Sequence, residues 1–96
     1  MGHEFHSLDD EHLVALAQGG DRRAERQLLR RYRPLVHKRC QPYFLNGAER
    51  DDLLQEGLIG LHKAIRDFRA GEGHAFSRFA ALCVNRHGVS AVRTEM

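Results

Sequence analysis

Carboxylate and amide side chains gather at the start of one amphipathic segment, residues 51–68. Asp52, Gln55 and Glu56 lie there at helical spacing, and a segment rich in arginine follows at residues 76–93. Carboxylates and amides on one helix face can meet basic groups of a partner helix. Arginines on a second helix suit phosphates. The two segments together predict one protein partner and one nucleic-acid partner.

No spacing in the chain indicates catalysis. A nucleophile elbow, a glycine-rich phosphate loop and an HExxH motif are all missing from the sequence. His3, His6, Asp9 and His12 could approach a metal, but they lack the defined spacing of a zinc site. We therefore expect no enzymatic activity, no cofactor and no bound metal.

Length and composition predict one soluble globular domain. The chain has 96 residues, of which 42% are hydrophobic and 29% are charged. We expect a single domain over 1–96, with residues 1–6 as a flexible terminus. There is no signal-peptide pattern and no apolar run of membrane-spanning length, so we expect a cytoplasmic protein without membrane contact. Cys40 and Cys83 are interpreted as reduced core thiols.

Charge alternates along the chain although the net charge is only +2. Residues 1–20 carry four acids and no Lys or Arg, residues 21–45 carry eight bases and two acids, and residues 46–67 carry more acids than bases. Such blocks can place separate acidic and basic faces on one fold. The arginines of residues 22–39 are either a solvated face or a contact with a partner or with phosphates.

Two helices are expected in the first half of the chain. The first begins at the N-cap candidate Ser7 and ends at Gly19-Gly20. The second begins at the N-cap candidate Asp21, and its buried face recurs every three or four residues. Pro34 should kink this helix or break it near Arg33.

Two more helices are expected in the second half. The third runs from about Ala48 to Phe68, and the fourth starts near Ala75. Gly57 and Gly60 lie inside the third helix, where glycine is unfavourable unless another helix approaches closely. The expected buried side of the third helix consists of Leu54, Leu58, Leu61, Ile65 and Phe68. We predict an all-α fold, a compact bundle of about four helices.

The motif that starts at Asp52, DLLQEGLIGL, resembles the core-binding motif of bacterial sigma-70 family initiation factors. The downstream stretch DFRAGEGHAF and the segment AALCV after Phe79 resemble the family too, and specifically its sporulation-type sigma-H branch. The resemblance covers about residues 8–93. It implies region 2, a helical domain that binds the clamp helices of the polymerase β′ subunit and recognises and melts the promoter −10 element.

The resemblance assigns roles residue by residue. Positions that match clamp contacts of the family are Asp52, Gln55, Glu56, Leu58 and His62. Positions that match or neighbour DNA contacts are Lys63, His74, Arg78, Phe79, Leu82, Asn85, Arg86, Val89 and Arg93. Aromatic side chains at such positions hold flipped bases, and arginines bind phosphates or guanine edges.

Several departures from the family leave a second function open. Leu82-Cys83 replaces a tryptophan pair, and Gly88 replaces a bulky aliphatic residue, so DNA recognition is weakened at both places. Nothing resembles the helix-turn-helix region 4, so we expect either an isolated domain or a separate region 4 chain. The alternative is a sigma-like interaction module, a decoy or anti-sigma partner, without promoter recognition. A general basic nucleic-acid binder is disfavoured by the small net charge.

Overall fold

Helices make up almost all of the chain that the structure describes. The structure is a computed structural model that describes residues 8–44, 50–71, 73 and 75–95, with side chains for 8–41, 51–71, 73 and 75–87. The helices are α2 (Asp10–Gln18), α3 (Arg22–Phe44), α4 (Arg50–Asp67) and α5 (Phe76–Glu95), and these ranges contain no strand. This arrangement confirms the predicted all-α bundle. None of the described helices has the length and apolar character to cross a membrane.

Aspartates start the first two helices. The Asp9 carboxylate accepts a hydrogen bond from the His12 backbone N–H at 2.9 Å, so Asp9 is the N-cap of α2. The prediction of Ser7 as the cap was wrong, and Ser7 itself lies outside the described residues. Asp21 caps α3 as predicted, because its carboxylate accepts from the backbone N–H of Arg23 at 2.9 Å. Gly20 joins the two helices with a φ of 101°, which favours glycine.

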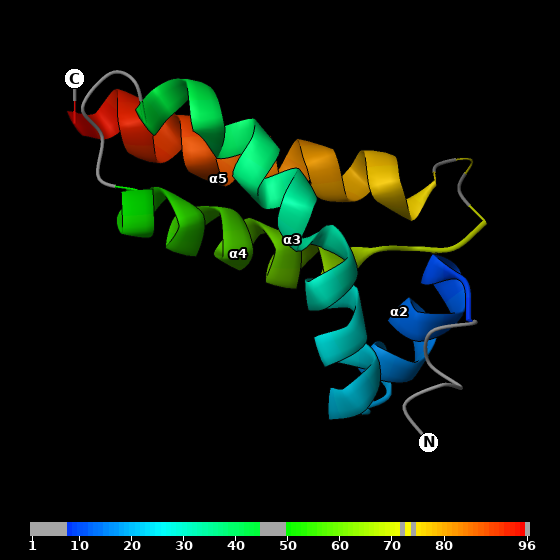
Figure 1. Ribbon diagram of the computed structural model, residues 1–96. Coiled ribbons are helices and arrows are strands. Elements are labelled where there is room, and N and C mark those ends of the chain that lie inside the picture. The colour runs from blue at the N-terminus through cyan, green and yellow to red at the C-terminus, as the bar shows by residue number, and fades with distance from the viewer. Residues whose placement is uncertain (1–7, 45–49, 72, 74, 96) are drawn as a thin grey trace.

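Pro34 bends α3 without breaking it. The helix is continuous from Arg22 to Phe44, and its ribbon changes direction near the middle (Figure 1). Proline cannot donate to the carbonyl of Arg30, four residues earlier, and its ring pushes that turn outward. Both residues are exposed, so water can take the place of the lost donor. Of the two outcomes predicted for Pro34, the structure therefore shows the kink and not the break.

Two glycines bring the helices next to α4 into close contact. A Cβ on Gly60 would lie 2.6 Å from the Cys83 carbonyl oxygen of α5, and one on Gly57 would lie 2.7 Å from Val36 Cγ1 of α3. The predicted reason for both glycines, close approach of another helix, is confirmed. The α4 and α5 helices run antiparallel along this seam, and α3 lies across them (Figure 1).

The core fills the space between the four helices and includes Leu13 and Val14 of α2. Phe76, the first residue of α5, packs edge-on against Tyr32 and Phe68, with ring centroids 5.3 Å apart in both pairs. Phe76 is buried, and so is Phe68, as predicted. On α4 the buried stripe is rotated slightly from the expected one, because Leu54 and Leu58 are only partly buried. Its buried members are Leu53, Gly57, Gly60, Leu61, Ala64 and Ile65, and Phe68, directly after the helix, is buried as well.

Candidate functional site

The outer face of α4 carries polar groups around one exposed isoleucine. Residues spaced by three and four along a helix share a face. Asp52, Gln55 and His62 are exposed, and Ile59 lies between them with 44% of its surface exposed. The resemblance did not assign Ile59, although an apolar residue inside a polar stripe is a signal that could have found it. An apolar residue ringed by polar groups is a typical centre for a protein contact.

Two histidine–carboxylate pairs tie this face to the neighbouring helices. His62 Nδ1 lies 2.9 Å from Glu25 Oε1 of α3, and His87 Nδ1 of α5 lies 4.0 Å from Glu56 Oε2. Each pair is ionic only when its histidine is protonated. Glu56 is half-buried at the α5 edge of α4, whereas Asp52 and Gln55 project into solvent.

Leu58 does not belong to the exposed face. It is partly buried and packs against the core at the margin of α4, so only its edge is open to a partner. Beside Ile59, an open pocket of about 430 Å³ lies between α4 and the corner of α2 and α3. Its lining residues are Ala17, Gln18, Glu25, Ile59, His62, Lys63, Ile65 and Arg66. The face therefore has charged margins and, beside Ile59, an open pocket that a side chain of a protein partner can fill.

The outer face of α5 is cationic and also carries an exposed apolar residue. Arg78, Leu82 and Arg86 recur every four residues, and all three are exposed. Leu82 has 48% of its surface in solvent. Asn85 lies on the same side and is half-buried. Arginine, an amide and an apolar group on one helix face can bind phosphates, base edges and an unstacked base.

Phe79 lies at the edge of this face rather than on it. The ring is half-buried and packs at a tilt against Phe68, with centroids 5.9 Å apart. It is thus shared between the core and the outer surface. A ring held in this way is already ordered before any base could stack on it.

Lys63 of α4 lies on the side of the helix that borders α5. Burial raises the pKa of the Cys83 thiol, Arg86 and Lys63 lower it, and Asp67 raises it. Lys63 and Asp67 belong to α4 and Arg86 belongs to α5, so these charges come from both helices of the seam. Lys63 can extend the cationic face of α5 across the seam. Cys83 is only half-buried, whereas Cys40 is buried as predicted and donates to the Leu53 carbonyl at 3.5 Å.

The structure does not describe the side chains of three residues that the resemblance assigns to DNA contacts. His74 is one of them, and Val89 and Arg93 are the others. The α5 helix runs through both of the latter positions and through Gly88, so the glycine does not end the helix.

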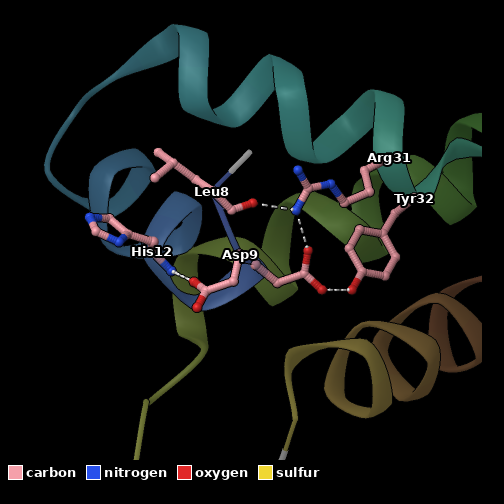
Figure 2. A network of polar contacts seen from close by, with 6 residues as sticks. Leu8, Asp9, His12, Arg31 and Tyr32 are labelled. Carbon is pink, nitrogen blue, oxygen red and sulfur yellow. Dashed lines mark hydrogen bonds and ion pairs between the residues drawn. The ribbon is translucent and has the colours of Figure 1, made fainter. Parts of the chain in front are cut away.

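Two polar contacts that the sequence did not predict hold the faces in place. The Gln18 amide of α2 donates to the carbonyls of Ile65 at 2.9 Å and Phe68 at 2.8 Å, so it caps the C-terminal end of α4. Arg31 donates to the Leu8 carbonyl at 3.0 Å and to the Asp10 carboxylate at 2.8 Å (Figure 2). Tyr32 donates to the same carboxylate. This second network joins α2 to α3.

Comparison with known proteins places the chain in a family. The Sigma-70 region 2 model matches residues 28–96. The chain is 42% identical over 90 residues to the RNA polymerase sigma-H factor of Bacillus licheniformis, covering 94% of this chain and 40% of that protein. It is 41% identical over 91 residues to the sigma-H factor of Bacillus subtilis, covering 95% of this chain and 42% of that protein.

More distant relatives point the same way. The sigma-28 factor of Bacillus thuringiensis is 34% identical over 79 residues, covering 81% of this chain and 33% of the relative. No solved structure shows a significant match. The chain spans about two fifths of the length of the sigma-H factors that it matches. These relatives are sigma factors and not enzymes, in agreement with the sequence-based expectation. The helical fold and the family match together show that the chain belongs to the sigma-70 family of RNA polymerase sigma factors, through their region 2.

Proposed function

We propose that the chain is a sigma factor region 2 module that acts in transcription initiation. The α4 face would bind the RNA polymerase core at the clamp helices of the β′ subunit, and the α5 face would recognise and help melt the promoter −10 element. The observation that carries the proposal is the separation of two exposed faces, one centred on Ile59 and one on Leu82. The sigma-H relatives support it, and a cytoplasmic location would follow.

On α4, charge and shape are suited to a basic partner helix. Asp52, Gln55 and Glu56 provide two carboxylates and an amide that can pair with arginines on the clamp. Ile59 supplies the apolar centre, and Leu58 and His62 form the margins. Rim charges would fix register and speed association, while buried apolar contact would supply most of the affinity.

On α5, the proposed roles divide between backbone contacts and bases. Arg78, Arg86 and Lys63 would neutralise phosphates, and Asn85 would reach a base edge. Leu82 and the ring of Phe79 would support an unstacked base, a contact worth about 1–3 kcal/mol for an aromatic. His74, Val89 and Arg93 are proposed as further DNA contacts from the family resemblance. We also propose that residues 1–96 form a single domain.

The test is binding of the chain to a purified β′ clamp-helix fragment, with and without a −10 non-template oligonucleotide. We expect binding that the oligonucleotide strengthens. The double variant Gln55→Ala/Glu56→Ala should lose clamp binding and keep its helical circular dichroism. A matched control, Glu11→Ala/Gln41→Ala, removes the same two chemical groups from exposed positions off α4 and should bind normally.

Each other outcome removes a defined part of the proposal. Unchanged affinity of the Gln55/Glu56 double variant would remove α4 as the clamp-binding face. Clamp binding that is indifferent to the oligonucleotide would remove promoter recognition and leave an interaction module. The pair Arg78→Ala and Arg86→Ala should weaken only the oligonucleotide effect.

A further inference from the structure

The outer face of α3 carries cations that neither proposed face uses. Its buried side, with Leu28, Tyr32 and Val36, is turned toward the other helices, so the opposite side points away from them. The exposed cations of α3 are Arg22, Arg23, Arg26, Arg30, Arg33, Lys38 and Arg39, and helical spacing places Arg26, Arg30 and Arg33 together on the outer face. We define the α3 stripe as Arg26, Arg30 and Arg33.

No described carboxylate neutralises the α3 stripe. Glu25, the one acid within α3, lies 2.9 Å from His62 of α4. Asp10, on the neighbouring helix, is engaged by Arg31 and Tyr32 (Figure 2). Among the residues with described side chains, none forms an ion pair with the α3 stripe. The positive charge of this face is therefore open to solvent.

Ordinary solvation does not explain this arrangement. Exposed helix faces usually alternate in sign, so that Glu and Lys four residues apart stabilise the helix. Here Arg22, Arg26 and Arg30 are spaced by four, where like charges destabilise a helix. Arg22 also lies in the first turn, where the helix dipole opposes cations. A face that costs stability in the free chain indicates a polyanionic ligand that neutralises it.

The spacing and residue type favour the phosphates of a nucleic acid. Four residues of helix rise about 6 Å, and each DNA strand presents a phosphate about every 3.4 Å along its axis, so neighbouring arginines can reach separate phosphates of one strand. The guanidinium fork matches phosphate oxygens. A membrane surface is disfavoured, because the exposed large apolar residues in the described chain, Ile59 and Leu82, both lie off α3.

We propose that the α3 stripe binds the phosphate backbone of duplex DNA without reading its sequence. This site is separate from the α5 face and goes beyond the proposed function. It would stand even if the assignment of α4 to the clamp failed. In a larger complex it would hold duplex DNA against the far side of the bundle, while α5 engages the melted strand.

The test measures affinity for a 30-base-pair duplex that lacks a −10-like sequence, over a range of KCl concentrations. The variant R26Q/R30Q/R33Q should bind at least tenfold more weakly at low salt. The slope of log affinity against log salt should fall by about 2.7, because each lost phosphate contact removes about 0.9. The matched control R26K/R30K/R33K keeps the charge and should keep the slope. An unchanged slope in the glutamine variant would overturn the proposal.

Two further readouts test the α3 stripe against a purely structural role and against an acidic protein ligand. The glutamine variant should melt at the same temperature or higher, since it removes like-charge repulsion, and should still bind the clamp-helix fragment. A lower melting temperature would indicate a structural role instead. Polyglutamate should compete poorly with the duplex at equal charge concentration. Equally strong competition would overturn the choice of nucleic acid in favour of an acidic protein.

Discussion

The α4 and α5 helices pack against each other along one seam, yet their outer faces are organised in opposite ways. On α4, the exposed histidine and a half-buried glutamate are already paired, with Glu25 and His87 respectively. On α5, Arg78 and Arg86 form no ion pair with any described side chain. A face that combines carboxylates and an amide with an exposed isoleucine suits a partner helix that carries basic groups. A face whose arginines form no ion pair with a described side chain suits a polyanion such as a nucleic acid.

The two helices also differ in how they are anchored. The last carbonyls of α4 are held by Gln18 of α2. The first residue of α5, Phe76, is held by the edges of two rings, one of which belongs to Tyr32. A polar cap therefore fixes the end of one helix, and aromatic packing fixes the start of the next.

The largest effect should come from filling the seam itself. Gly60→Ala would place a Cβ 2.6 Å from a carbonyl oxygen and 3.0 Å from Val84 Cα, which are backbone atoms that cannot rotate away. The gain in helix propensity is about 1 kcal/mol, and overpacking against backbone costs more. We expect a net loss of about 2 kcal/mol of unfolding free energy, visible as a melting temperature lower by about 8–16 °C.

Gly57→Ala is the matched control for this change. Its nearest contact is the Val36 side chain, which can shift, so the loss should be clearly smaller. Equal losses for the two variants, measured by denaturant unfolding, would mean that the α4–α5 seam is no tighter than the α3–α4 contact.

Changing the cap of α4 should have the next largest effect. Gln18→Glu replaces an amide donor with a carboxylate that faces backbone carbonyls at the negative end of the helix dipole. We expect a loss of about 1–2 kcal/mol, larger than that of Gln18→Ala, which only removes hydrogen bonds. If alanine proved the more damaging substitution in denaturant unfolding, Gln18 would act by packing and not as a cap.

Changing Tyr32, whose ring packs against the first residue of α5, should have a smaller effect on the unfolding free energy, and this effect should depend on pH. Burial, together with the hydrogen bond to Asp10, raises the pKa of Tyr32 well above its ordinary value of about 10. A raised pKa means that the unfolded chain loses this proton first. The stabilisation is therefore complete below about pH 10 and is lost as the pH rises above it.

Tyr32→Phe should thus cost about 1 kcal/mol at neutral pH and remove part of the alkaline loss of stability. Melting curves at pH 7 and pH 10.5 for both chains would measure the difference. Parallel losses in the two chains would show that the hydroxyl contributes nothing to alkaline unfolding.

Substitutions of the two exposed apolar residues should have the smallest effect on stability and should distinguish the binding roles of the two faces most clearly. Ile59→Ser and Leu82→Ser each remove one exposed apolar side chain, so unfolding free energies should change by less than about 0.5 kcal/mol. We expect Ile59→Ser to weaken clamp binding at least tenfold and Leu82→Ser to weaken only the oligonucleotide effect. A variant that weakens both would contradict the division of the outer surface into two faces.

The order of the helices and their glycine seam could be predicted from the sequence, because these features depend on local spacing. Gly57 and Gly60 interrupt a helical pattern, and only a close neighbour explains them. Pro34 gave the bend for the same local reason. The cap of α2 was misplaced because both Ser7 and Asp9 are good N-cap residues, and sequence alone does not rank them.

Contacts between distant residues were beyond the sequence. The partners of Gln18 lie 47 and 50 residues further along the chain. Asp10 meets Arg31 and Tyr32, 21 and 22 residues away. Nothing in local spacing indicates such pairs. The family resemblance supplied most positions on the two faces, but Ile59 was assigned neither to the buried side nor to a contact, because the carry-over followed the matched motif positions alone.

The missing Cβ atom at Gly60 also has a mechanical consequence for the α4–α5 seam. Where backbones nearly touch, no layer of side chains remains that could repack and absorb a displacement. The two outer faces must therefore move as one rigid piece. If they are used as proposed, a polymerase docked on α4 holds the α5 surface at a fixed height and tilt over the DNA. The domain would then fix the position of the promoter DNA relative to the polymerase. It would not need to change shape to do so.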